Sequence, residues 1–294
     1  MNLFDRLVNE ALQNQPNLSS LRPVVEKELL HHDILRIMRD NNLTTELTFI
    51  GGTCLRCCYG GVRLSEDLDF TGGSNFSKEK LSSLGRIISE SLQDKYGLRV
   101  NVSEPLNDNQ DEHTWKIRVE TKPRTKHLPA QRINVDICSL TSYERRPRML
   151  LNPYGVDMGT SGLIIQAQSC EEIYSDKLIA VAYRANRIKY RDIWDIFWLH
   201  SIGQRPRVEL IPNKVEDRQH TIENFLHLFG QRVRLLKEKR EMAAEFKQEM
   251  RRFLPAMHLK TVEHENYWDF ILNLFEDWNN QLRNNFNIKA RQGE

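Results

Sequence analysis

The chain has 294 residues, of which 39% are hydrophobic and 28% charged, and its formal net charge is +2. This length predicts about two domains, and the composition is that of a soluble globular chain and excludes a disordered one. No apolar run approaches the ~18 residues of a membrane helix and no secretory pattern opens the chain, so we predict a cytoplasmic protein without a membrane partner. With so small a net charge, any nucleic-acid surface has to come from local clusters.

Cysteine is the next composition signal. Three of the five cysteines lie in the run CLRCC at residues 54–58, a spacing too close for a disulfide framework. No second CxxC or HxxxH lies nearby to complete a zinc site. We therefore predict reduced thiols that serve as small core residues.

In chain order, the sequence predicts a helical lead-in over about residues 1–42 and then strands mixed with helices. A helix is expected to open at Ser77 and to end at Gly97, where glycine stops it. From about Glu171 onward the pattern is mostly helical. The expected strands, rich in apolar alternation, are 46–50, 68–71, 98–104, 113–121 and 131–140.

This order predicts an α+β fold, with a small mixed sheet and interposed helices, followed by a helical bundle. Of the 14 glycines, 11 lie between residues 51 and 162, so turn-rich sequence gives way to long helices after that point. We therefore place a first domain at 1–160 and a C-terminal helical domain at 161–294.

A strand that leads into two glycines and a threonine is the first candidate for a binding site. The apolar run at 46–50 is followed directly by Gly51, Gly52 and Thr53. Glycine permits close approach of the backbone, and the N-terminus of the next helix offers unpaired amides with a partial positive charge. We expect these residues to hold a phosphate, with Thr53 adding a hydroxyl donor and Ser65 in the same site.

Two aspartates follow on a predicted strand. Side chains alternate along a strand, so Asp67 and Asp69 point to one face while Leu68 points into the core. Neighbouring carboxylates repel each other unless a cation lies between them. Mg²⁺ (or Mn²⁺) meets that need, because magnesium prefers oxygen ligands and pairs one or two carboxylates with substrate phosphates.

A third acid fits the same site. On the predicted strand at 131–140, Asn134 and Asp136 share one face while apolar residues alternate with them. If this strand lies beside that of Asp69, then Asp67, Asp69 and Asp136 form a metal cluster of three carboxylates that bridges a triphosphate and an attacking hydroxyl.

These motifs occur in a fixed order: Gly-Gly-Thr, a gap of 13 residues, Asp-x-Asp, and then an acid on a later strand. The whole order is a more specific signal of function than any one of these motifs alone. It resembles the polymerase-β-type nucleotidyltransferases, and within them the AbiEii/AbiGii abortive-infection toxin family. The segment that carries the resemblance is FIGGTCLRCCYGGVRLSEDLDF, and the resemblance spans about residues 45–200. It implies that 1–160 is a polymerase-β-like nucleotidyltransferase domain that uses an NTP.

The resemblance includes two predicted helices further along the chain. Lys177 and Arg184 are seven residues apart and share a helical face, and Asp192 and Asp195 share another. A lysine and an arginine would clamp a triphosphate and stabilise developing charge, although spacing alone favours solvated helices joined by salt bridges. The resemblance implies nucleotide binding by Lys177 and Arg184, and essential roles for Lys177 and for Asp192 or Asp195.

Nine basic residues and three acids lie between residues 116 and 148. Such a basic rim beside a carboxylate cluster suits a phosphodiester backbone, although a solvated hairpin would also carry these charges. The residues expected to bind nucleic acid are Lys116, Arg118, Lys122, Arg124 and Lys126.

A second basic segment, 231–252, holds eight basic residues and four acids, and we expect it to be one helix. Pairs such as Lys237–Glu241 explain only part of its charge. The sequence does not decide whether it extends an RNA track or binds an antitoxin.

Together these features predict a metal-dependent nucleotidyltransferase that transfers a nucleotide from an NTP to an acceptor, most of all RNA, and releases pyrophosphate. Asp136 is expected near the attacking hydroxyl. The resemblance implies a phage-defence toxin with a cognate antitoxin, and a tRNA 3′ end as acceptor. Two alternatives stay open: a non-catalytic NTP-binding regulator, and a nuclease or phosphohydrolase that uses the same acids, against which the Gly-Gly-Thr element argues.

Overall fold

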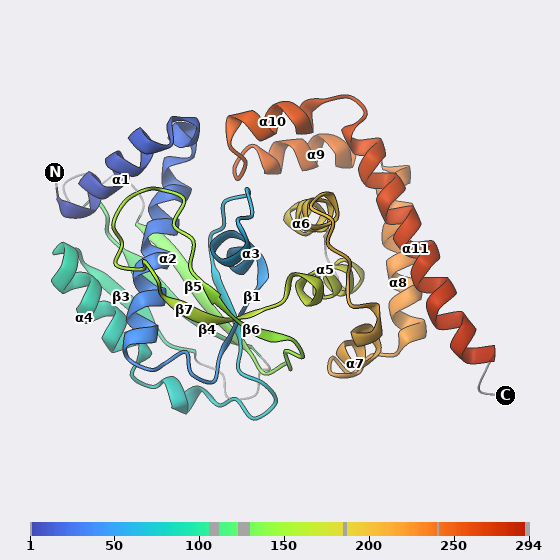
Figure 1. The fold of residues 1–294 in the computed structure, drawn as a ribbon, viewed down its shortest axis with the longest axis horizontal. Coiled ribbons are helices and arrows are strands. Elements are labelled where there is room, and N and C mark those ends of the chain that lie inside the picture. Colours follow the sequence, from blue (N-terminus) through green and yellow to red (C-terminus); the bar gives the residue numbers. More distant parts are fainter. Residues whose placement is uncertain (1, 106–111, 123–129, 185–186, 240, 292–294) are drawn as a thin grey trace. The chain divides into compact units, whose positions relative to one another are not determined.

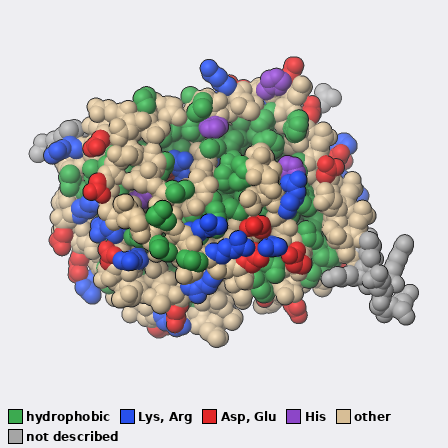
Figure 2. Space-filling model, in the orientation of Figure 1, with side chains coloured by type: hydrophobic (Ala, Val, Ile, Leu, Met, Phe, Trp, Pro, Cys, Tyr) green, Lys and Arg blue, Asp and Glu red, His purple; other side chains and the backbone are tan. Residues whose placement is uncertain are grey.

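A computed structural model describes residues 2–105, 112–122, 130–184, 187–239 and 241–291, the last five by backbone alone. The chain forms two compact units that divide between Gln168 and Ser169, past the expected boundary at residue 160 (Figure 1). Within the described ranges, no helix is both long and apolar enough to cross a membrane. Figure 2 shows acidic and basic side chains interspersed over the visible surface, as the small net charge implies.

Unit 1 is built from a sheet and the helices that pack on it. Its helices are α1 (Leu3–Asn14), η1 (Pro16–Leu21), α2 (Arg22–Asp40), α3 (Gly51–Tyr59), η2 (Lys78–Leu81) and α4 (Leu84–Tyr96). Its strands are β1 (Thr48–Ile50), β2 (Leu68–Thr71), β3 (Val100–Ser103), β4 (Glu112–Val119), β5 (Gln131–Cys138), β6 (Arg145–Met149) and β7 (Ile164–Gln168).

These strands form one mixed sheet in the order β3-β4-β5-β2-β1-β7-β6. The β2–β5 and β1–β7 pairs are parallel and the remaining pairs are antiparallel. The α+β class predicted from the sequence is confirmed. Because β2 lies between β1 and β5, the segments that carry Gly51, Asp69 and Asp136 become neighbours.

The sheet has one buried face and one partly exposed face near its centre. On β5, Ile133, Val135 and Ile137 are fully buried, and α2 and α4 pack against the sheet at β5 and β3 (Figure 1). The alternating residues Arg132 and Asp136 keep partial solvent access. The candidate acids therefore lie opposite the core, as strand alternation requires.

Two local expectations in unit 1 are corrected. The helix expected from Ser77 is split into η2 and α4, because the chain makes a turn at residues 82–83 before α4 begins; it still ends at Gly97, with a left-handed φ of 62°. Strands β6 and β7 were not predicted, and they extend the sheet beyond β1. All five cysteines are free thiols and four are buried, as expected of core residues.

All regular elements in the described part of unit 2 are helices, as predicted. The 231–252 segment is two helices rather than one, because α8 ends at Glu238 and α9 begins at Glu241. Helix α8 packs along α11 (Figure 1). The helices of unit 2 are α5 (Cys170–Tyr183), α6 (Tyr190–Ser201), η3 (Val208–Leu210), α7 (Ile211–Glu216), α8 (Ile222–Glu238), α9 (Glu241–Met250), α10 (Ala256–Glu263) and α11 (Tyr267–Arg291).

Candidate active site

Two of the three predicted acids lie directly across from each other on neighbouring strands. In the parallel β2–β5 pair, the Cα of Asp69 is opposite that of Asp136. Asp67 lies just before β2, opposite Asn134 by continuation of the same register. All three side chains are half-buried, so they keep access to solvent.

Gly51 fits closely against Asp69. In the antiparallel β1–β2 pair, Ile50 is opposite Asp69, so the chain enters α3 beside that carboxylate. Gly51 has a φ of +76°, and a Cβ built on it would lie 2.6 Å from the Asp69 Oδ2. Only glycine lets the amide end of α3 approach this carboxylate so closely.

Asp67 is held by backbone and side-chain hydrogen bonds. Its Oδ1 accepts a hydrogen bond from the Asn134 amide at 3.2 Å. The Thr53 hydroxyl lies 2.7 Å from Ser65 Oγ and also contacts the Asp67 carbonyl oxygen. The sequence had led us to expect that the hydroxyls of Thr53 and Ser65 would face a phosphate. The two residues are 0% and 5% exposed, and these contacts hold the segment that carries Asp67.

A buried glutamate that the sequence analysis missed supports this segment. Glu28, on α2, is 2% exposed and accepts a hydrogen bond from the Ser65 amide at 2.8 Å. It also binds Arg56 Nε at 3.1 Å and the Tyr154 hydroxyl. Burial, with Glu28 beside it, raises the pKa of Tyr154, so this hydroxyl stays a donor. Nothing in a glutamate on an amphipathic helix signals such a role in sequence.

His31 holds the other side of the same segment. It is fully buried, and its Nε2 lies 3.0 Å from the Glu66 carbonyl oxygen, next to Asp67. Burial lowers the pKa of His31 to about 4, although the nearby Asp67 charge opposes this. At neutral pH the ring is therefore uncharged and donates to Glu66.

The carboxylates fit a divalent cation that is shared with a substrate. Among the residues placed by the structure, no group of three or more His, Cys, Asp and Glu side chains is gathered to hold a metal ion. Asp67 already uses one oxygen on Asn134, while Asp69 and Asp136 lie in register. Magnesium is commonly held by one or two carboxylates plus substrate phosphates, so this donor set suits an ion that arrives with a nucleotide.

A basic row continues from the acids along the partly exposed face of the sheet. Thr114 is opposite Asp136, Lys116 is opposite Asn134, and Arg118 is opposite Arg132. Directly paired residues point to the same face, so the exposed Lys116, Arg118 and Arg132 lie on the face of Asp136. Arg118 also contacts Glu120 at 3.3 Å.

The rest of the predicted basic turn is less informative. Lys122 is half-buried and lies 3.6 Å from Glu26, so part of its charge is neutralised within unit 1. Arg124 and Lys126 lie outside the described residues.

In unit 2, the predicted lysine and acids form a compact ion cluster. Lys177 Nζ lies 2.6 Å from Asp192 Oδ1 and 2.9 Å from Asp195 Oδ2. Arg184 Nε lies 2.8 Å from Asp192 Oδ2. Helix α5 ends at Tyr183, so Arg184 follows the helix instead of sharing its face with Lys177 as expected.

The electrostatics of this cluster keep Asp192 ionised. Burial alone would raise the pKa of Asp192, but Lys177 and Arg184 outweigh it and lower the pKa to about 2. The side chains of Asp192 and Asp195 are 4% and 5% exposed, and that of Lys177 is 13% exposed. The lysine is thus fixed between the carboxylates of Asp192 and Asp195.

A second buried ion cluster in unit 2 was not predicted. Lys214, which is 1% exposed, lies 2.7 Å from Glu172 and 3.0 Å from Asp176. Arg218 also contacts Asp176 at 3.0 Å. These residues join α7 to α5, and their spacing in sequence gives no sign of the contact.

Comparisons with known proteins identify the family of this chain. The family model described as "Nucleotidyl transferase AbiEii toxin, Type IV TA system" matches residues 33–274. No curated protein sequence matches the chain.

Solved structures that are similar to this chain include two that cover most of it. One is MenT4, the nucleotidyltransferase toxin Rv2826c from Mycobacterium tuberculosis H37Rv, with a TM-score of 0.54 and 15% identity over 96% of this chain and 97% of that chain. The other is JHP933 from Helicobacter pylori, with a TM-score of 0.47 and 16% identity over 92% of this chain and 98% of that chain. At these identities the likeness to MenT4 shows a common fold.

Proposed function

We propose a reaction on the premise that this chain belongs to the AbiEii nucleotidyltransferase toxin family of type IV toxin–antitoxin systems. Membership makes the chain a nucleotidyltransferase toxin with an NTP as substrate and an antitoxin as partner. The proposal is that it transfers a nucleotide from the NTP to RNA, at the 3′ end of a transfer RNA, and releases pyrophosphate.

One observation carries the proposal. Asp69 and Asp136 lie opposite each other on β2 and β5, and Gly51 places the amide end of α3 against Asp69. Phosphate oxygens bind at helix N-termini, and carboxylates hold the cation that accompanies them. The two kinds of group meet here within one unit.

In the proposed step, the amides at Gly51 and Gly52 bind triphosphate oxygens. The acceptor hydroxyl oxygen attacks the α-phosphorus, a new oxygen–phosphorus bond forms, and the bond from that phosphorus to the bridging oxygen of the β-phosphate breaks. Pyrophosphate leaves with the electron pair of that bond. Asp136 accepts the hydroxyl proton, and positioning with charge stabilisation supplies most of the rate.

Asp69 and Asp136, with Asp67 beside them, would hold Mg²⁺ or Mn²⁺. When bound, the cation supplies positive charge that neutralises the phosphates. Thr53, Ser65 and Glu28 act on this site by fixing the segment that carries Asp67.

The basic row supports RNA as the acceptor. Lys116, Arg118 and Arg132 extend away from Asp136 on the same face of the sheet. Cations that contact successive phosphates position a nucleic-acid strand without reading its sequence. A strand lying on this row would bring its terminal hydroxyl toward Asp136.

For unit 2, we propose that the cluster around Lys177 is needed for transfer and that Asp192 is the essential helical acid. Asp192 contacts both Lys177 and Arg184, so its loss would release both cations. We also propose that the toxin acts in the cytoplasm, where NTPs and transfer RNA are available, and that it serves in phage defence by abortive infection.

The test is transfer of radiolabelled nucleotides by the full chain to total RNA, with Mg²⁺ or Mn²⁺, alongside pyrophosphate release. Wild type is expected to label RNA, and Asp69→Asn to abolish labelling with an unchanged circular-dichroism spectrum. NTP binding without pyrophosphate release would indicate a regulator, and shortened RNA a nuclease. Either result would overturn the proposal.

A further inference from the structure

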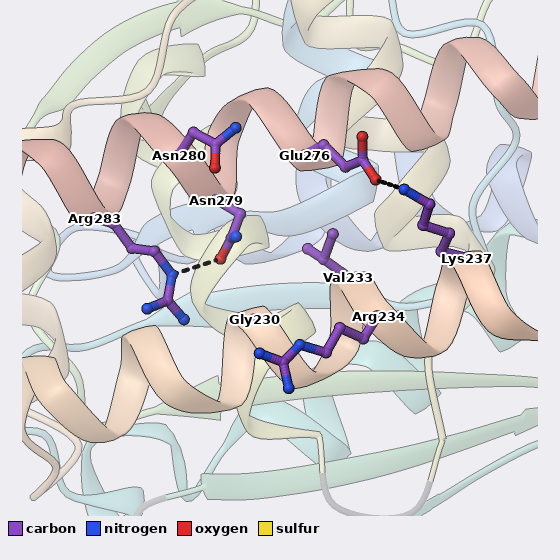
Figure 3. Close-up of a pocket in the computed structure, with 8 residues that line it drawn as sticks. All are labelled: Gly230, Val233, Arg234, Lys237, Glu276, Asn279, Asn280 and Arg283. Carbon is purple, nitrogen blue, oxygen red and sulfur yellow. Dashed lines mark hydrogen bonds and ion pairs between the residues drawn. The ribbon is translucent and has the colours of Figure 1, made fainter.

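A basic groove lies between α8 and α11 in unit 2, on part of the segment whose role the sequence left open. Its volume is about 300 Å³ (Figure 3). Three cations and one acid line it, together with asparagines. The residues that matter here are Gly230, Arg234, Lys237, Glu276, Asn279 and Arg283.

Gly230 makes room for Arg283. A Cβ built on Gly230 would lie 2.7 Å from Arg283 Nη2, so the guanidinium lies against the backbone of α8 (Figure 3). Arg283 Nε donates to Asn279 Oδ1 at 3.3 Å, and Nη2 donates to the Leu226 carbonyl oxygen at 3.3 Å. A guanidinium has five N–H donors, so donors remain for a ligand while these bonds fix its plane.

Arg234 adds a second guanidinium to the groove. It lies one turn after Gly230 on α8, is exposed, and forms no ion pair with any residue in the described ranges. Lys237 does not pair with Glu241 as the sequence suggested, because it reaches across to Glu276 on α11 at 2.6 Å. Glu276, the one acid of the groove lining, is therefore paired with Lys237. The positive charges of Arg234 and Arg283 are left without a carboxylate among the lining residues.

We propose that this groove binds a phosphate of a nucleic-acid backbone and so forms a second anchor for the acceptor RNA. The inference rests on the proposed function. Arginine matches phosphate with paired donors, and the asparagines add neutral polar contacts. Among the described lining residues, Val233 is the one apolar side chain, whereas protein partners are usually anchored by apolar and aromatic side chains.

The experiment measures binding of fluorescently labelled transfer RNA to the full chain by anisotropy, over a series of salt concentrations. Arg234→Gln is expected to raise Kd about tenfold and to reduce the slope of log Kd against log salt by about one. Gly230→Ala is a second variant, because it displaces the flexible end of Arg283 without removing a charge, and it is also expected to weaken binding. Circular dichroism checks that both variants fold.

Lys260→Gln is the matched control, since it removes one exposed charge from α10, outside the groove. It is expected to leave Kd within about twofold of wild type. An equal loss in Lys260→Gln and Arg234→Gln would overturn the inference, as would an unchanged Kd in both groove variants. If the groove variants kept their affinity for RNA and lost affinity for a polyglutamate peptide, the groove would be a protein site instead.

Nucleotide transfer is measured on the same preparations to separate the two proposals. If all variants labelled RNA and the Kd for transfer RNA were unchanged, the proposal that the groove binds RNA would be overturned and the proposed reaction would stand. Loss of RNA affinity in the groove variants, from a wild type that labels no RNA, would keep the groove and overturn the reaction.

Discussion

The acids of the two units lie in opposite environments. In unit 1, Asp69 and Asp136 lie on a partly exposed sheet face. In unit 2, the side chains of Asp192 and Asp195 are nearly buried and contact Lys177 directly. Carboxylates with solvent access can receive a cation from solution, whereas a buried ion cluster is neutralised by the protein itself. Substitutions in the first arrangement should therefore change activity with little effect on stability, whereas substitutions in the second should lower stability as well as the proposed transfer.

The largest expected effect tests the first arrangement. Asp136→Asn removes a charge from the proposed cation and the acceptor of the hydroxyl proton, so the transfer rate should fall about 10³-fold or more. The rate of RNA labelling measures this, and the urea midpoint of unfolding should stay that of wild type. Glu112→Gln, an exposed acid on the adjacent strand β4, is the control and should keep full activity. A fully active Asp136→Asn variant would show that the partly exposed acids of unit 1 are not needed for transfer, and would contradict the proposed contrast with the buried acids of unit 2.

Lys177→Met tests the second arrangement. It leaves Asp192 and Asp195 buried without their lysine, which should lower the free energy of unfolding by about 3–5 kcal/mol. Urea unfolding measures the change. Lys237→Met, in the exposed pair with Glu276, should cost less than about 1 kcal/mol. Equal losses in the two variants would show that burial of the cluster has no energetic consequence.

The pH dependence of stability should separate the units. Burial lowers the pKa of His31 and His32 from 6.5 to about 4. The unfolded chain therefore binds protons near pH 6.5 while the folded chain does not, and unit 1 loses stability as the pH falls from 6.5 towards 4. The loss is on the order of 3 kcal/mol per histidine. In unit 2, the contribution of Asp192 is complete above pH 3.8 and is lost only as the pH falls towards about 2.

Urea unfolding across this pH range checks the prediction. It is followed by tryptophan fluorescence in two variants of the five-tryptophan chain, one that keeps only Trp115 of unit 1 and one that keeps only Trp278 of unit 2. The His31→Gln/His32→Gln double variant should flatten the dependence seen by Trp115. If the double variant still lost stability between pH 6.5 and pH 4, equally by the Trp115 and Trp278 signals, the two histidines would not be the cause and the prediction would be wrong.

The smallest expected effect concerns Gly51. Gly51→Ala would place a methyl group against the Asp69 carboxylate and force alanine to a φ of +76°. Strain of this kind costs about 1–2 kcal/mol, and displacement of Asp69 should lower the transfer rate about 10- to 100-fold. Gly73→Ala is the control, because it has the same φ with nothing within 4 Å of its Cβ, so it should cost stability without lowering the rate. Equal rates in the two variants would count against the role of Gly51.

The placement of the candidate acids could be predicted from the sequence because it follows local rules. Alternation along β2 and β5 put Asp69 and Asp136 opposite the core, and Gly51 marked the end of a strand. The pairing of β2 with β5 was a conditional expectation, because strand register is set by contacts between distant segments. The fold class followed from the order of elements.

What was missed depends on contacts between distant residues. Strand β6 reads as a basic segment with Pro147, which a strand tolerates because β6 is at the edge of the sheet. The break between α8 and α9 interrupts a segment with continuous helical character. Glu28 and Lys214 carry no local signal, since each is defined by partners far away in the chain.

The contacts of Glu28 have a practical consequence for shortened versions of the protein. The residues matched by the family model begin at 33, so a fragment trimmed to that match would lack this glutamate. Arg56 would then remain largely enclosed without its carboxylate, and the Ser65 amide would lose its acceptor. Helix α2 thus supports the proposed active site. An inactive truncated toxin would therefore indicate the loss of this support and would not show that a reacting group had been removed.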